Sequence, residues 1–265
     1  MHYIWKEWKE NLRGKGLWLS LSIIGLISLS ILFRSSPLSF AKGFYVLLLN
    51  LFDTIIYFIP ILCLFIGAFS IFQEKEQKTL IMLLTKKENY QSFLWKKSLS
   101  LYTVVLLPLI GWFFIYLLFS KFKFQLDGGS YFIFVLSIIL MAVIFLQMGA
   151  AIGSFSRSRM QIVGYTIFVW FYFFFLHDFL LLSFLPNVSH DNVTWFSIAY
   201  FINPLEAVRM FLETGIGVYS FGHMSRLLQA FMWTKPVYFL IGDLVFWLCV
   251  SFGAAVIFHR QEANE

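Results

Sequence analysis

The sequence contains few charged residues. Asp, Glu, Lys and Arg make up 13% of its 265 residues, whereas 60% are hydrophobic and the mean hydropathy is +0.78. A soluble domain normally carries about 25% charged residues, because its surface faces water. The shortage of charge therefore excludes an ordinary soluble domain and indicates a membrane protein.

Cysteine is almost absent, and common enzyme motifs are missing. Cys63 and Cys249 both lie inside apolar runs, so neither a four-thiolate metal site nor a disulfide framework is indicated. The sequence has no Gly-x-x-x-x-Gly-Lys-Ser/Thr, no His-Glu-x-x-His and no Gly-x-Ser-x-Gly motif. We therefore expect no catalytic residues, no metal site, no cofactor and no ATP site in this chain.

Long hydrophobic runs are what the sequence has instead. A hydrocarbon core about 30 Å thick needs roughly 20 mostly apolar helical residues to cross it. Six such runs occupy approximately residues 17–33, 44–72, 98–119, 131–153, 161–185 and 236–258. No soluble domain or low-complexity linker separates them. We therefore predict an all-α membrane protein in which residues 1–265 form a single transmembrane domain with six helices.

The basic residues are distributed unequally between the two sides of the predicted bundle. Of the 20 Lys and Arg residues, 13 fall on the side that holds both termini and the remaining 7 on the other side. Membrane proteins retain Lys and Arg in their cytoplasmic loops. We therefore expect a multi-pass protein of the cytoplasmic membrane with both termini in the cytoplasm. The same rule explains the net charge of +6 without a nucleic-acid partner.

Residues 1–16 have the pattern of an amphipathic helix. Ile4, Trp5, Trp8 and Leu12 fall on one helical face, and basic residues occupy the rest of the wheel. Such a helix lies in the membrane interface, with its apolar side in the headgroup region and its cations near anionic lipid. A frayed basic tail is the alternative.

The predicted cytoplasmic stretch 73–97 contains the apolar segment 80–84 between charged residues. This segment is too short to cross the bilayer, so its side chains need a protein surface or the membrane interface to bury them. An apolar face with a charged rim is typical of a helix that docks on a partner. We favour a docking site over a simple connecting loop.

The predicted external stretch 186–235 contains a well-marked helix start. Asn203 suits the N-cap, Pro204 the first helical position and Glu206 the third, where its charge complements the helix dipole. Arg209 and Glu213 can pair one turn apart. We expect a short external amphipathic helix before the last span, dipping into the outer leaflet.

Three acidic residues lie within the predicted spans, namely Asp53, Asp178 and Asp243. A carboxylate at membrane depth is costly unless it faces protein or water, so each is a candidate pathway residue or a structural hydrogen-bonding group. Met141 and Met148 lie seven residues apart on the fourth span, and their thioether groups are of a kind that can bind copper. Methionine at helical spacing is typical of packing, and we expect packing here.

Three segments resemble one known family, the type-two ABC-exporter permeases. They are Glu74-x-Glu76-x-x-Thr79-Leu80-x-x-Leu83-Leu84-Thr85, Val169-Trp170-Phe171 through Asp178-x-x-Leu181-Leu182, and Asn203-Pro204 through Arg209 followed by Gly215. They are most similar to the permease of the nitrous oxide reductase maturation system. The chain departs from that subgroup at Gln77 and Lys78, where a glycine is usual, and in the polar stretch 187–194.

The resemblance implies a homodimeric permease whose two cytoplasmic loops dock on two copies of an ABC ATPase, which binds ATP and Mg²⁺. The docking residues carried over are Glu74, Glu76, Thr79, Leu80, Leu83 and Leu84. The narrower subgroup implies an extracytoplasmic β-helix accessory protein and a role in assembling the copper-sulfur centre of nitrous oxide reductase. Two alternatives stay open. They are the permease of a drug or bacteriocin-immunity exporter, and a membrane anchor or intramembrane enzyme that uses Asp53, Asp178 or His177.

Overall fold

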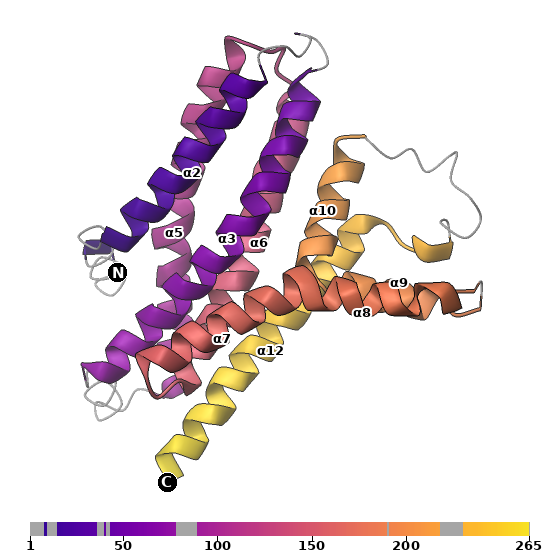
Figure 1. Cartoon of the computed structure of the whole chain (residues 1–265). Coiled ribbons are helices and arrows are strands. Elements are labelled where there is room, and N and C mark those ends of the chain that lie inside the picture. The colour runs from indigo at the N-terminus through magenta and orange to yellow at the C-terminus, as the bar shows by residue number, and fades with distance from the viewer. Residues whose placement is uncertain are drawn as a thin grey trace.

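The structure is a computed structural model that describes residues 8–9, 15–35, 40, 43–77, 89–189, 191–217 and 230–264. Every regular element in these ranges is a helix (Figure 1), which confirms the predicted all-α class. Almost all of the predicted interfacial helix 1–16 lies outside the described residues. So do Thr79, Leu80, Leu83 and Leu84 of the predicted docking segment.

The long helices run up and down the bundle in chain order. They are α2 (Lys15–Arg34), α3 (Gly43–Glu76), α5 (Tyr90–Lys121), α6 (Gly128–Phe155), α7 (Arg159–Phe171) and α12 (Pro236–Asn264). Shorter elements lie between α7 and α12, namely the π-turn η1 (Tyr172–Leu176), α8 (His177–Phe184), the 3₁₀ turn η2 (Leu185–Asn187), α9 (Val193–Phe201) and α10 (Pro204–Gly215). Short connections join α2 to α3, α5 to α6 and α6 to α7, and each of these pairs of consecutive helices is in contact; in addition, α2 packs with α5 and α3 packs with α6.

Six helical segments of the described chain are long and apolar enough to cross a membrane, as predicted. The fifth of them is composite, because α7, η1, α8 and η2 follow one another without a break over 159–187. Several helices extend beyond the predicted apolar runs. Since α3 continues to Glu76 and α5 begins at Tyr90, both flanks of the predicted loop 73–97 are helical. Hydropathy marks the part of a helix that lies in lipid, whereas the helix itself continues into water.

The largest interface joins α3 and α6, the central pair of the bundle. Glycines allow the two backbones to approach closely, as small residues do between membrane helices. A β-carbon added at Gly67 would collide with the backbone of Leu146 on α6. One added at Gly149 would collide with the backbone of Leu64 on α3. The pair therefore forms a rigid centre on which the other helices pack.

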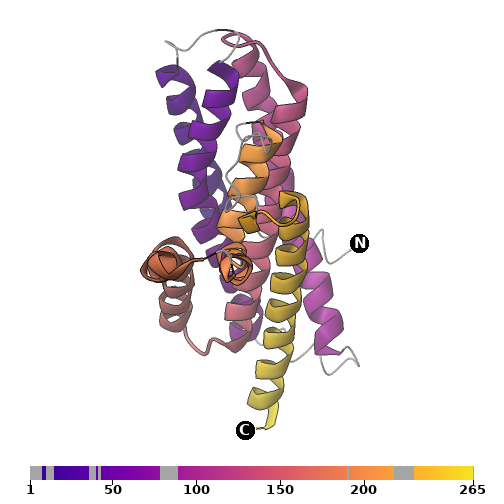
Figure 2. The same cartoon turned by 90° about the vertical axis from the view of Figure 1, so that its right-hand side faces the viewer.

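Helix α10 packs against α6 and α12, and Figure 2 shows it upright beside them. The helix begins at Pro204 and ends at Gly215, and it precedes the last span as predicted. Its buried residues are Pro204, Leu205, Glu206, Ala207, Val208 and Leu212. The sequence predicted a helix dipping into the outer leaflet; in the structure its apolar stripe is buried against the bundle.

We name the two ends of the bundle by what they hold. The loop end contains the end of α3, the start of α5, the end of α6 and the start of α7, which lie together at the bottom of Figure 1. The opposite end contains the end of α2, the start of α3, the end of α5 and the start of α6. There the Gln125 amide donates to the Phe40 carbonyl, which ties two of the connections together.

Replacing Gly149 with alanine should destabilise the fold, because the added methyl group forces α3 and α6 apart. We expect a loss of about 1–3 kcal/mol, typical of overpacking a core, and a lower melting temperature of the detergent-purified protein. Gly164 of α7 is the matched control, since an added β-carbon meets nothing within 4 Å there. Equal melting temperatures for Gly149→Ala and Gly164→Ala would contradict close packing of α3 on α6.

Candidate functional site

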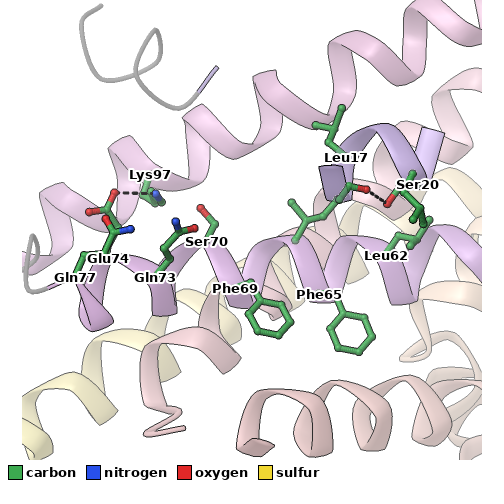
Figure 3. Close-up of a pocket in the computed structure, with 13 residues that line it drawn as sticks. Leu17, Ser20, Leu62, Phe65, Phe69, Ser70, Gln73, Glu74, Gln77 and Lys97 are labelled. Carbon is green, nitrogen blue, oxygen red and sulfur yellow. Dashed lines mark hydrogen bonds and ion pairs between the residues drawn. The ribbon is translucent and has the colours of Figure 1, made fainter. Parts of the chain in front are cut away.

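A buried ion pair lies at the loop end of α3. The Lys97 ammonium of α5 donates a hydrogen bond to Glu74 Oε1 at 3.1 Å, and the two side chains are only 2% and 4% exposed. The pair borders a cavity of about 440 Å³ between α2, α3 and α5 (Figure 3). Polar groups gather at this end of the cavity, namely Ser70, Gln73, Glu74, Gln77 and Lys97. The pair therefore fixes the root of the predicted docking loop to both helices that flank it.

The next two residues of α3 make further ties. Lys75 donates to the backbone carbonyl of Ser154 at the end of α6. Glu76 accepts two hydrogen bonds from the Arg159 guanidinium at the start of α7, at 2.8 and 3.2 Å. Bidentate pairs of this kind fix orientation as well as position. Consecutive residues of α3 thus hold α5, α6 and α7, so the segment 78–88 starts from an anchored base.

Asn203 forms a second polar junction, at the start of α10, and it is fully buried. Its side-chain oxygen accepts from the Leu205 amide at 3.1 Å, as expected for an N-cap. Its amide nitrogen donates to the Phe173 carbonyl at 2.9 Å and contacts His177 Nδ1 at 3.2 Å. The predicted N-cap is confirmed, and its other half joins α10 to the fifth span.

The π-turn in the fifth span supplies the carbonyl that Asn203 binds. In an α-helix the amide of His177 would bond to the carbonyl of Phe173. Here it bonds to the carbonyl of Tyr172. The Phe173 carbonyl is therefore available to a side chain from another element. Single π-turns often mark functional positions, and this one brings the fifth span to α10.

Hydrogen bonds also decide which nitrogen of His177 carries the proton. His177 Nε2 lies 3.0 Å from the Ala199 carbonyl, which can only accept, so Nε2 is the donor. Asn203 donates through its amide nitrogen, because its oxygen is already the cap of α10. Nδ1 of the neutral ring is therefore an acceptor. It has no proton for Asp178, whose Oδ1 lies 3.3 Å away.

Arg209 of α10 lies among carboxylates. Its Nη1 donates to Glu206 Oε1 at 3.3 Å, and its Nε lies 4.0 Å from Asp53 Oδ1 of α3. Tyr200 of α9 donates its hydroxyl to the other oxygen of Glu206. Burial and the neighbouring Glu206 charge both raise the pKa of the Tyr200 hydroxyl, so Tyr200 keeps the proton. The predicted partner Glu213 adds charge nearby, but the hydrogen bond of Arg209 goes to Glu206.

Arg209 lines two grooves. The polar groove, of about 1090 Å³, lies between α2, α3 and α10, and its polar lining includes Arg34, Asn50, Asp53, Thr54, Arg209 and Glu213. The apolar groove, of about 520 Å³, lies between α8 and α9 and is bordered at its polar end by Asp178, Tyr200, Glu206 and Arg209. The Arg209 side chain thus borders both the polar groove and the apolar groove.

The three predicted carboxylates have different environments. Asp53 is 60% exposed in the polar groove, and Asp178 is 44% exposed in the apolar groove. Asp243 is buried, and neither of its oxygens has a hydrogen-bond partner among the described residues. Met141 and Met148 pack in the hydrophobic core. The structure therefore joins Asp53 to Arg209 and Glu206, and leaves Asp243 apart.

Sequence reasoning missed the roles of two side chains, Lys97 and Tyr200, and gave His177 a different one. Lys97 was counted only as a basic loop residue, although a lysine eight residues into a helix that begins at Tyr90 is already within the bundle. Tyr200 had no motif around it, and its role depends on a contact between separate helices. His177 was named only as a candidate of the intramembrane-enzyme alternative, whereas in the structure it contacts Asn203 of another element. The Asn-Pro helix start was the one signal that pointed to this junction.

Comparison with known families gives one match. The model described as ABC-2 family transporter protein matches residues 1–263. No curated protein matches the chain. The match covers the described helices from α2 to α10 and nearly all of α12.

Replacing Lys97 with methionine should strongly destabilise the protein, because the buried Glu74 charge would lose the Lys97 ammonium. Breaking a buried pair in this way costs about 3–5 kcal/mol, and the melting temperature in detergent measures the loss. The double variant Lys97→Met with Glu74→Gln should recover much of it. Glu76→Gln, which breaks the exposed pair with Arg159, should change the melting temperature little. A Lys97→Met protein as stable as the wild type would show that the Lys97–Glu74 ion pair does not hold α5 to α3.

Proposed function

The chain belongs to the ABC-2 transporter family, and from this premise we propose that it supports maturation of the copper-sulfur centre of nitrous oxide reductase. Members of this family are multi-pass permease subunits that pair with ABC ATPase subunits. The permease has no ATPase activity of its own, and the partner binds ATP. The proposal concerns the narrower role, the partners on each side of the membrane and the residues that meet them.

The observation that carries the narrower role is the contact of two segments that resemble the maturation permease. One is the fifth-span segment 169–182, and the other is the Asn-Pro helix 203–215. Asn203 of the second segment bonds to Phe173 and His177 of the first. Two segments that share a resemblance therefore also share one buried polar junction, which supports treating them as a functional unit.

The ATPase docks, in this proposal, on segment 80–84 between α3 and α5. The ion pairs of Glu74 with Lys97 and of Glu76 with Arg159 support this assignment. A loop that receives force must start from a fixed base, and these pairs hold the end of α3 to α5 and α7. ATP binding by the partner draws the two docking segments of a homodimer together. Helix α3 carries the movement from Glu74 to Asp53, which pairs with Arg209 of α10. The two sites are coupled only if both bias the same two-state element.

The orientation follows from the basic residues. We place the loop end and both termini in the cytoplasm and the polar groove on the outer face. A β-helix accessory protein then meets the outer ends of α2, α3 and α10, where Arg34, Asp53 and Glu213 offer polar contacts. This placement accounts for a large polar groove at the end of the bundle opposite the predicted ATPase.

A second candidate function is export of a hydrophobic compound by the same kind of complex. The apolar groove between α8 and α9 favours it, because its walls offer a hydrophobic surface with carboxylates at one end. Such a permease shares the ATPase and needs no accessory protein on the outer face.

Replacing Leu83 and Leu84 together with aspartate should abolish copurification of the ATPase and leave membrane insertion intact, because charges on the apolar face prevent docking. An affinity-tagged permease and quantification of the ATPase by immunoblot measure this. Phe122→Asp is the control, since Phe122 is 86% exposed and lies just after α5 at the opposite end. A doubly substituted protein that still copurifies with the ATPase would contradict docking of the ATPase on segment 80–84.

Deletion of the gene in its host should leave nitrous oxide reductase without its copper-sulfur centre and inactive, because the maturation complex lacks its permease. Reductase activity and the copper content of the purified reductase measure this. The gene should also stand beside genes for an ABC ATPase and a β-helix protein. An active, copper-loaded reductase in the deletion strain would contradict the maturation role and leave the export role.

A further inference from the structure

The apolar groove is formed by one face from each of two short antiparallel helices. On the α8 side, Asp178, Leu181, Leu182 and Leu185 recur at spacings of three, four and seven, so they share one helical face. On the α9 side, Val193, Phe196 and Tyr200 do the same. The groove therefore follows from the sequence pattern of both helices and holds about 520 Å³. A cavity of this size suits a drug-sized molecule.

Aromatic rings close the groove near its polar end. Phe231 has its ring centre 5.4 Å from that of Tyr200 and 6.3 Å from that of Phe196. All three residues line the groove. Aromatic faces attract cations, and the attraction grows when water is excluded. The groove thus offers a hydrophobic body with a region that prefers positive charge.

Within the ranges that the structure describes, Asp178 of this groove contacts one ring nitrogen and no hydrogen-bond donor. Its Oδ1 lies 3.3 Å from Nδ1 of His177, which accepts from Asn203 and has no proton to give in the neutral ring. The other acid of the groove, Glu206, accepts from Arg209 and Tyr200. Arg209 also lies near Asp53, so its charge is already shared. The polar end therefore has a surplus of negative charge at Asp178.

We propose that the groove between α8 and α9 binds a hydrophobic cation, with its positive charge at Asp178 and its apolar body against Leu181, Leu182 and Phe196. A neutral hydrophobic molecule would fill the apolar groove and supply no positive charge to pair with the Asp178 carboxylate. An anion would be repelled by Asp178. The sign of the charge thus follows from the side chains present. The proposal deepens the second candidate function, because it gives the charge of the compound that the groove takes. Binding to the purified chain needs neither the ATPase nor the accessory protein, so it can fail or succeed independently of transport.

Tetraphenylphosphonium and tetraphenylborate test the proposal, since they have the same shape and opposite charge. Equilibrium dialysis of radiolabelled tetraphenylphosphonium against the detergent-purified full chain should show saturable binding. Radiolabelled tetraphenylborate, dialysed in a separate sample, should show no saturable binding. Asp178→Asn should weaken binding by about tenfold or more, as expected for loss of a charge partner in an apolar site, and Asp178→Glu should retain it.

Asp127→Asn is the matched control. Asp127 caps α6 with bonds to Gly129 and Ser130, at the opposite end of the bundle, and asparagine caps equally well. This variant should bind the cation like the wild type, and melting temperatures confirm that all variants are folded. Equal binding by the wild type and Asp178→Asn would overturn the proposal. So would equal saturable binding of tetraphenylborate in its own sample, or absence of binding because a second copy of the chain covers the groove.

Discussion

The arrangement of the second half of the chain depends on one buried amide, that of Asn203. Polar groups inside a membrane protein must find partners within the protein, because lipid offers none. Both N–H donors of this side chain are used, by the Phe173 carbonyl and His177 Nδ1, and its oxygen accepts from the Leu205 amide. One residue thus starts α10, accommodates the π-turn and orients His177. Because His177 Nδ1 accepts from Asn203, it cannot donate to Asp178 in the neutral ring, and no other residue of the described ranges does so.

Helix α3 connects this junction with the loop end. Asp53 near its start pairs with Arg209, and Glu74 near its end pairs with Lys97. Twenty-one helical residues separate the two acids, which corresponds to about 30 Å along the axis. The glycine contacts with α6 make this helix part of the rigid centre. A movement of the loop end of α3 at Glu74 is therefore transmitted along this helix to Asp53, and through Arg209 to α10 and both grooves.

The sequence predicted the spans and the start of α10 because both depend on local signals. Apolar runs of sufficient length mark the helices, and Asn203, Pro204 and Glu206 mark a helix start. The ion pair of Lys97 with Glu74 could not be predicted, because it joins residues on two helices whose rotation about their axes has no local signal. The π-turn in the aromatic stretch 172–176 likewise depends on a distant residue, because the Phe173 carbonyl that it frees is bound by Asn203, 30 positions further along the chain. Helical spacing allows Arg209 to pair with either Glu213 or Glu206, and the structure has the pair with Glu206, whereas the contact with Asp53 depends on how α10 packs against α3.

The state of the His177 ring tests the central junction most directly. Nitrogen-15 NMR of histidine-labelled protein in lipid, with His177 identified by comparison with His177→Gln, distinguishes a protonated ring nitrogen from an unprotonated one. The hydrogen bonds described here predict a proton on Nε2 and a lone pair on Nδ1 at neutral pH. A proton on Nδ1 would contradict donation by Asn203, and with it the link between α10 and the fifth span and the uncompensated charge of Asp178.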